Sequence, residues 1–476
     1  MISSVTSSRN LVELLAEWRS AAPAYEALAG RIRLLVIDGR LPGGTRLPAE
    51  RDLAARLGVS RTTVTAAYQR LRDAGYGVSR QGSGTQVVHP VMTTAPTDAP
   101  SQLLDFTKAA LAAPGATMDA VRWASEQLPA FLATTGYDTM GIPITREAIA
   151  RRYTERGLPT DADQVLVTVG ALQAINLVAR TFVSRGDRAL VEAPTYPHAC
   201  EAFATAGARL VAAPVSSVAP DGWDVETFES VLRRTSPTLA YLMPDFQNPT
   251  GCTMSLSVRH RILEAATAQS TIVVVDETSA ELNIDRPGTF APLAALTNGA
   301  TVITIGSASK SMWGGLRVGW IRAERSIIRR LHAVRASFDL GAPVLDQLVT
   351  AELFDRYDEV LADRRAILLE GRDAVKQMIG EAFPDWQVPH VHGGLAAWIG
   401  LGAPVSSQLA LAARTEGLLI SAGPRFGIDG SFERYLRVPI TYPADQVQRA
   451  VFALSRAWPM ASRMPYSDPH GLAAVV

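Results

Sequence analysis

The scarcity of lysine in this 476-residue chain makes each lysine informative. The three are Lys108, Lys310 and Lys376, and the other 43 of the 46 basic residues are arginines. Lys310 lies between two serines, directly after an apolar run. An arginine guanidinium stays protonated, whereas a desolvated lysine amine can attack an aldehyde and form a Schiff base. Lys310 is therefore a candidate nucleophile.

Two predicted strands place this lysine close to a carboxylate. Residues 272–275 are β-branched and apolar, and they predict a buried parallel strand that ends at Asp276. Residues 301–305 predict a second strand, which leads to Ser307 and Lys310. Ligands of open α/β sheets bind outside the carboxyl ends of the strands. Pyridoxal 5'-phosphate requires a lysine for its aldehyde and a carboxylate for its ring nitrogen. The alternative, a surface lysine and an unrelated aspartate, is disfavoured by the neighbouring motifs.

Five motifs follow one another along the chain: Gly170–Ala174, Glu192–Pro197, Gln247–Gly251, Gly315–Trp320 and Tyr435–Val438. They resemble the motifs of fold-type I, class I/II aminotransferases, in the order of that family. The resemblance covers residues from about 105 to 460 and predicts an α/β body with a small carboxyl-terminal α/β lobe at about 345–460. It implies a cofactor site built from Gly170, Ala171 and Leu172 (the phosphate cup), Tyr196 (stacked on the ring), Asn248 (bonded to the phenol oxygen), Asp276, Ser307, Ser309, Lys310 and Arg317 (bonded to the phosphate).

The same resemblance implies a site for an amino compound. Arg437, in Tyr435–Val438, resembles the arginine that grips the α-carboxylate, for which a bidentate fork is well suited. Asn248 and Tyr137 are assigned to the same site, and Tyr137 lies in a segment that resembles the part of the family near a dimer boundary. One departure stands out: the family usually has a tyrosine two or three residues after the ring aspartate, where this chain has Thr278 and Ser279. Efficient turnover is therefore in doubt.

The amino-terminal part predicts a different kind of domain. Residues 24–88 have the pattern of a winged helix-turn-helix: a helix over 25–37, a second helix from Pro48, a third from Arg61 to Ala74 with Ser60 as N-cap, and a hairpin over 78–88. The segments Leu47–Ala54 and Leu57–Val64 closely resemble the GntR-type DNA-binding domain. That resemblance implies that the following residues contact double-stranded DNA: Arg51, Ser60, Arg61, Thr62, Thr63 and, at the wing tip, Gln81 and Gly82.

Charge and composition fit this division. The chain is neutral as a whole, but residues 1–90 hold twelve arginines against seven acidic residues. A basic module suits a phosphate backbone. Residues 89–104 are rich in Pro and Thr and predict a linker to an aminotransferase-like domain at 105–464. Apolar runs are too short for a membrane span, a signal pattern is not seen, and two cysteines exclude a disulfide framework, so we expect a cytoplasmic protein. The histidines lack metal-ligand spacing, and His390 and His392 are expected to pack on a strand.

A winged helix fused to an aminotransferase-like body is similar to the MocR subfamily of GntR regulators. The resemblance implies a homodimer that binds an operator and senses pyridoxal 5'-phosphate or a small amine or amino acid that reacts with it. Two alternatives remain open. The chain could be an active aminotransferase that carries a DNA-binding arm, or a cofactor-free repressor whose body only dimerises.

Overall fold

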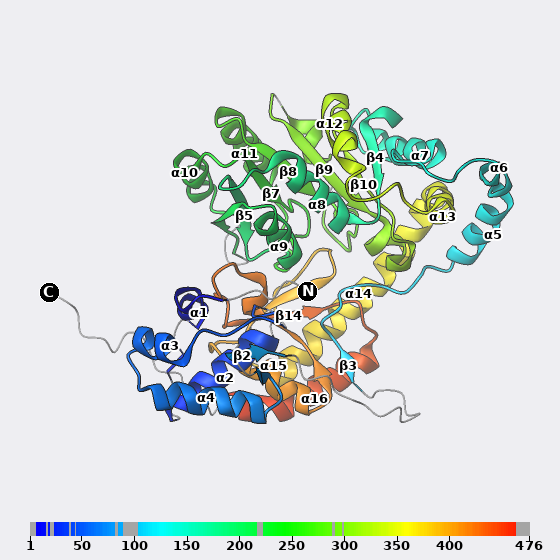
Figure 1. The fold of residues 1–476 in the computed structure, drawn as a ribbon. Helices are drawn as coiled ribbons and strands as arrows, with labels where there is room; N and C mark the ends of the chain where they lie inside the picture. Colours follow the sequence, from blue (N-terminus) through cyan, green and yellow to red (C-terminus); the bar gives the residue numbers. More distant parts are fainter. Residues whose placement is uncertain are drawn as a thin grey trace.

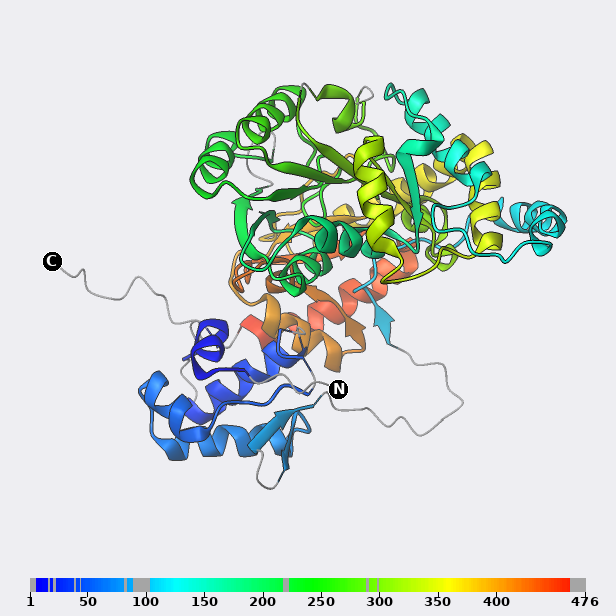
Figure 2. The same cartoon turned by 45° about the horizontal axis from the view of Figure 1, so that its top comes forward.

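The computed structural model describes residues 6–15, 18–19, 23–37, 40–42, 44–80, 84–88, 103–216, 222–287, 291–297 and 299–462. These residues form a large α/β body, a smaller lobe and an amino-terminal helical module. Figures 1 and 2 show the module (blue) beside the lobe (orange to red) and away from the sheet of the body (green).

The body is built on a seven-stranded sheet. Its order is β4 (Val165–Thr168), β10 (Gly319–Arg322), β9 (Val302–Ser307), β8 (Ile272–Asp276), β7 (Leu239–Leu242), β5 (Arg188–Ala193) and β6 (Arg209–Pro214). Only β10 is antiparallel to its neighbours, so the predicted mostly parallel sheet is confirmed. Asp276 pairs with Ile305, which places the carboxyl ends of β8 and β9 side by side.

Helices cover both faces of this sheet. Alternate strand residues point to opposite faces, so each strand contributes to two cores. One core contains Val273 and Val275, together with α7 (Pro143–Glu155), α10 (Val225–Thr235), α11 (Leu256–Ala268) and α13 (Val344–Asp355). The other contains Val274, together with α8 (Ala171–Phe182), α9 (Pro197–Thr205) and α12 (Arg325–Arg335). Helices α5 (Thr117–Gln127) and α6 (Pro129–Leu132) extend outward from the body (Figure 1).

The lobe packs three helices against a small antiparallel sheet. The sheet has the order β11 (Ala396–Gly400), β14 (Tyr435–Pro439), β13 (Ser421–Ala422), and the helices are α14 (Tyr357–Ala382), α15 (Ser406–Thr415) and α16 (Ala444–Ser462). A further strand comes from the start of the body segment, because β3 (Leu104–Asp105) pairs in parallel with β12 (Leu418–Leu419). Helix α13 packs in the core of the body, whereas the core of the lobe takes its α14 residues from Leu368 onward.

The amino-terminal module has the predicted winged helix-turn-helix order. Its elements are α1 (Ser8–Leu15), α2 (Ala24–Ile37), α3 (Glu50–Leu57), α4 (Arg61–Asp73), β1 (Gly77–Arg80) and β2 (Gly84–Val87). Helix α1 was not predicted, yet Leu11 and Leu15 are fully buried in the core of the module. Helix α3 begins at Glu50 rather than Pro48, because Pro48 lies before the N-cap residue Ala49. Among the described residues no helix is both long and apolar enough to cross a membrane.

Candidate functional site

Lys310 lies where two strands of the body end. It sits in a π-helical turn, Ser309–Trp313, which follows β9 directly. Its Nζ donates to the carbonyl of Ala109 at 2.8 Å. Burial lowers the pKa of Lys310 to about 8, the Arg437 cation acts in the same direction, and Asp276 opposes both. A fraction of this amine is therefore neutral near pH 7, which a nucleophile requires.

Asp276 is held in place by partners on its own and the neighbouring strand. Its Oδ2 accepts a hydrogen bond from the Tyr241 hydroxyl at 2.6 Å, and its Oδ1 accepts from the Thr278 amide at 2.9 Å. The carboxyl is 7% exposed. Sequence reasoning missed Tyr241. Its signal is a polar side chain in the otherwise apolar strand 239–242, in register with Val274, two residues before Asp276.

The start of α8 and Arg317 form a cradle for an anion. Gly170 has φ of +88°, and α8 begins at the next residue, Ala171, so the first amides of the helix are free of intrahelical partners. A Cβ added to Gly170 would lie 2.7 Å from Nη2 of Arg317. That nitrogen donates to the carbonyl of Val169 at 3.1 Å. Leu172 is in the first turn of α8, with 38% of its surface exposed. The structure thus brings together the predicted cup and the predicted phosphate arginine.

Arg437 lies on β14 of the lobe, with its side chain buried and turned toward the same region. It is 8% exposed, and its guanidinium lies 5.1 Å from the Phe426 ring centroid. Burial lowers the pKa of Arg437 to about 10. Its Nη2 contacts the carbonyl of Thr107, while its buried Nε has no hydrogen-bond partner among the described residues. A buried cation with an unpaired donor suits a carboxylate ligand.

The segment after β3 forms a strap across this site, which sequence reasoning also missed. Carbonyls of the strap accept hydrogen bonds from Arg437 (at Thr107), Lys310 (at Ala109) and, at 2.9 Å, Arg364 (at Ala112). Phe106 is 2% exposed and stacks on Tyr442 at 4.3 Å between centroids. The strap therefore connects Arg437 of the lobe and Arg364 of α14 to the turn that carries Lys310. Its contacts involve backbone oxygens, for which the sequence has no motif.

Tyr196 and Asn248 lie on loops that a buried glutamate holds together. Burial raises the pKa of Tyr196 to about 12, and the charge of Asp276 adds to the rise, so the two side chains are electrostatic neighbours. Gln247, directly before Asn248, donates from Nε2 to the Pro194 carbonyl at 2.7 Å and to Glu192 at 3.2 Å. Glu192 is fully buried, and burial raises its pKa to about 8 against the effect of its hydrogen-bond donors. The role of Glu192 in joining the loops of Tyr196 and Asn248 was not predicted.

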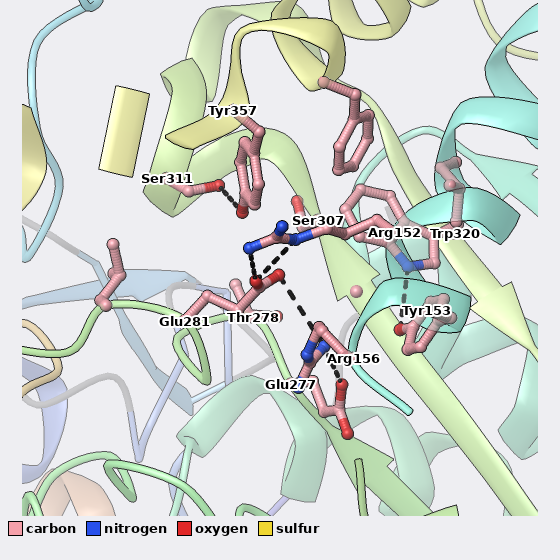
Figure 3. A pocket seen from close by; sticks show the side chains of 14 residues that line it. Arg152, Tyr153, Arg156, Glu277, Thr278, Glu281, Ser307, Ser311, Trp320 and Tyr357 are labelled. Atoms are coloured by element: carbon pink, nitrogen blue, oxygen red, sulfur yellow. Dashed lines mark hydrogen bonds and ion pairs between the residues drawn. The ribbon is translucent and has the colours of Figure 1, made fainter. Parts of the chain in front are cut away.

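The side chains of Thr278 and Ser279, which stand where the family has a tyrosine, lie in different surroundings. The hydroxyl of Ser279 donates to the Phe246 carbonyl at 3.4 Å, whereas Thr278 lines a polar cavity behind the lysine turn (Figure 3). Figure 3 shows Arg152 and Arg156 facing the carboxylates of Glu281 and Glu277, at 2.6 Å and 2.8 Å respectively. The cavity lies between these pairs and Ser307 and Ser311.

Of the remaining predicted residues, Ser307 and Ser309 lie at the lysine turn, whereas Tyr137 lies on the surface. Ser307 is buried and its Oγ accepts from the Ser309 amide at 3.2 Å, so both serines shape the lysine turn. Tyr137 is 71% exposed, and within one chain the structure does not bring it to Lys310 or Arg437.

The predicted DNA-contacting residues gather at the start of α4. The Ser60 side chain accepts from the Thr63 amide at 3.1 Å, which confirms Ser60 as the N-cap. Arg51, Ser60, Arg61 and Thr62 are exposed, and Thr63 is partly exposed. Arg61 lies 3.7 Å from Glu50, and 73% of its side chain is accessible. Gln81 and Gly82 lie outside the described residues.

The prediction that His390 and His392 pack on a strand is wrong. The two histidines instead form a cluster with Asp285. Both side chains are substantially exposed, at 38% and 51%. The three potential ligand atoms lie within 4.8 Å of one another. However, the Arg372 guanidinium already contacts Asp285, so the carboxylate has a counter-charge within the protein.

Comparison with known proteins agrees with both halves of this architecture. Residues 109–454 match the family model of aminotransferase class I and II, and residues 24–87 match that of bacterial regulatory proteins, gntR family. The chain is 25% identical over 472 residues to the HTH-type transcriptional regulator YdfD of Bacillus subtilis, covering 91% of this chain and 95% of the relative.

Other relatives match a smaller share of this chain. A 2-aminoadipate transaminase of Thermus thermophilus is 30% identical over 66% of this chain and 80% of its own length. The probable rhizopine catabolism regulatory protein MocR of Rhizobium meliloti is 30% identical over 63% of this chain and 65% of its own length. Among solved structures, α-aminoadipate aminotransferase LysN of Thermus thermophilus, complexed with N-(5'-phosphopyridoxyl)-L-leucine, has a TM-score of 0.69 at 28% identity and covers 76% of this chain and 93% of its own. This chain belongs to the aminotransferase class I and II family, and it is a GntR-type regulator in which a helix-turn-helix domain precedes an aminotransferase-like body.

Proposed function

We propose that this regulator binds pyridoxal 5'-phosphate through Lys310 and responds to an amino compound that carries a carboxylate. The observation that carries the proposal is the convergence of three groups from distant segments: Asp276 and Arg437, which are buried, and Lys310, which is partly buried. Lys310 and Arg437 donate to strap carbonyls two residues apart, at Ala109 and Thr107, and Asp276 pairs with Ile305 on the strand that leads to Lys310. The charges of Asp276 and Arg437 both affect the pKa of Lys310. The fold of the LysN complex supports the same assignment.

The residues present fit this cofactor. The cradle of Gly170, Ala171, Leu172 and Arg317 suits a phosphate. We expect Tyr196 and Asn248, on the two loops that Gln247 joins, to border the ring. When bound, pyridoxal 5'-phosphate supplies an aldehyde that amines attack. Asp276 would keep a proton on a ring nitrogen through a charge-assisted hydrogen bond. Ser307 and Ser309 fix the turn that aims Lys310.

Arg437 would then select the compound that is sensed. Its buried guanidinium offers donors to an α-carboxylate, and Lys310, which would hold the cofactor, is close enough to feel the charge of that guanidinium. The Ser279 hydroxyl is engaged by the Phe246 carbonyl and Thr278 lines the cavity behind, so the proton chemistry that the missing tyrosine supports is weakened. We therefore infer a sensor in which turnover is slow.

Assembly and location follow from the same family. We propose a homodimer that binds double-stranded DNA through two modules, in the cytoplasm. The outer helices α5 and α6 present exposed apolar side chains, among them Met118 at 60% and Leu132 at 72%, as a dimer surface requires. Tyr137 is near these helices in sequence, and we infer that it completes the site of a partner chain. Arg51, Ser60, Arg61, Thr62 and Thr63 are the proposed DNA contacts.

The test is the visible absorption of the purified protein with pyridoxal 5'-phosphate, followed while amino acids and amines are added. We expect a band from the lysine-bound cofactor that Lys310→Ala abolishes and the exposed-lysine control Lys376→Ala retains. A band that shifts with one amine and then stays constant identifies the effector. The same band in Lys310→Ala would refute the assignment.

An active aminotransferase is the second candidate, and it is favoured by the 30% identity to a transaminase. In that case an added amino acid would convert the cofactor fully to its amine form, with release of an oxo acid. Slow or absent release of the oxo acid would support the sensor.

A further inference from the structure

The lobe segment 423–433 touches the DNA-binding module at one end. Arg31 of α2 donates from Nη1 to Glu433 Oε1 at 3.1 Å, and the two side chains are only 13% and 20% exposed. Glu433 also accepts from the Ser407 amide at 2.9 Å and from the Ser407 hydroxyl at 2.8 Å. One carboxylate thus joins α2 of the module to the start of α15 in the lobe. A partly buried ion pair with this many hydrogen bonds is worth more than an exposed one.

A second contact supports the same docking. A Cβ added to Gly430 would lie 2.6 Å from Nη1 of Arg40, so the backbone of the segment and the side chain of the module are in close contact. Gly430 has φ of +88°, a conformation that also favours glycine. Helices α2 and α15 are in direct contact as well.

The other end of the segment touches the proposed cofactor and effector site. The Thr195 amide donates to the Phe426 carbonyl at 2.9 Å, directly before Tyr196. Arg425 pairs with Glu201 of α9 at 2.9 Å. The ring of Phe426 lies against the Arg437 guanidinium.

The two ends are parts of one packed unit. The Trp398 ring contacts Phe426 at 5.4 Å and Phe432 at 6.0 Å between centroids, and it stacks on Tyr435 at 5.3 Å. A Cβ added to Gly423 would lie 2.0 Å from the Phe432 carbonyl, so the two ends of the segment are in direct contact. Close-packed groups of this kind cannot shift independently.

We propose that segment 423–433 is the surface through which the lobe holds the DNA-binding module, and that this docking is linked to occupancy of the site at Arg437. The second part rests on the proposed function. A compound that moves Arg437 or the Tyr196 loop displaces Phe426, and the displacement changes the fit of Glu433 to Arg31. Because such coupling is reciprocal, a change in docking alters the affinity of the site by the same factor.

The first experiment measures docking on the full chain without cofactor. Amide hydrogen exchange is followed in residues 24–37 for Arg31→Met, which leaves the bonds between Glu433 and Ser407 intact, and for Glu433→Gln. The control is Glu416→Gln, which removes a lobe ion pair with Arg456 that does not reach the module. We expect faster exchange in the first two variants and no change in the control. Unchanged exchange in Arg31→Met would overturn the docking.

The second experiment measures the linkage with N-(5'-phosphopyridoxyl)-L-leucine as the probe. We expect the affinity of Arg31→Met to differ from that of the wild type by about fivefold or more, the lower end of typical coupling, with Glu416→Gln unchanged. Equal affinities, together with faster exchange, would overturn the linkage. A wild type that does not bind the probe would refute the proposed function and the linkage together, and the docking result distinguishes this case because it needs no ligand.

Discussion

The DNA-binding module and the site of the body differ in how far their functional side chains are exposed to solvent. In the module, the proposed contacts lie within a few residues of one another, at the start of one helix, and are exposed. In the body, Lys310, Asp276 and Arg437 come from segments far apart in the chain, and they are buried or nearly so. DNA recognition needs donors that reach outward, whereas an amine nucleophile needs a site that removes water from it.

This difference has a consequence for what substitutions do. A change on the exposed face of α4 removes one contact and leaves the fold unchanged. A change in the body alters the electrostatics of its neighbours as well, because buried charges interact strongly. The predictions below use this contrast, from the largest expected effect to the smallest.

Arg437→Met should abolish the response to carboxylated amino acids while retaining the cofactor. Loss of one partner of a buried charge pair typically costs about 2–5 kcal/mol, or about 30- to several thousand-fold in affinity. The measurement is the amino acid concentration that half-shifts the visible band. Amines without a carboxylate serve as the control, and they should react equally with both proteins. An unchanged amino acid response would mean that Arg437 does not bind the carboxylate.

Arg61→Ala should weaken binding to a DNA fragment that the wild-type protein has selected from a random pool. A bidentate base contact contributes about 1–3 kcal/mol, so the loss should be about 5- to 150-fold. Fluorescence anisotropy at fixed salt measures it. Arg180→Ala, on α8 of the body, is the matched control and should bind normally. Equal weakening on all sequences would show that Arg61 contacts phosphate rather than a base.

Ser60→Ala should destabilise the start of α4 by about 1 kcal/mol, because the Thr63 amide loses its acceptor. Ser60→Gly, which is a tolerated N-cap, should cost only a few tenths of that amount. Amide exchange in residues 61–73 compares the two variants. Similar exchange in both would indicate that the cap contributes little here.

The pH dependence of cofactor capture should report the environment of Lys310. Its neutral amine is the reactive form, so the rate of band formation should rise as the pH approaches about 8 and level off above that value. An ordinary lysine would give a rise that continues to higher pH. Arg437→Met removes a cation that favours the neutral form, so its midpoint should move to higher pH. A midpoint unaffected by this change would place Arg437 away from the amine.

The sequence alone predicted those elements and site residues that depend on neighbours close in the chain or on the end of a strand. Spacing and residue type predict helices α2, α3 and α4 of the module, the N-cap Ser60, the strand that ends at Asp276 and the mostly parallel sheet. Helix α1 was not predicted, because it is short and only two of its residues, Leu11 and Leu15, are fully buried in the core of the module. Tyr241, Glu192 and the strap were also not predicted, since their roles depend on partners that are distant in the chain or on backbone carbonyls.

The use of arginine throughout the chain gives the buried lysine an unusual chemical selectivity. Lys108 and Lys376 are exposed, whereas Lys310 is partly enclosed and burial lowers its pKa to about 8. At neutral pH a small, uncharged amine-reactive reagent would therefore modify Lys310 ahead of the other two side chains. Among the lysine side chains, the extent of labelling at Lys310 would therefore report whether the strap and Arg437 still surround its amine.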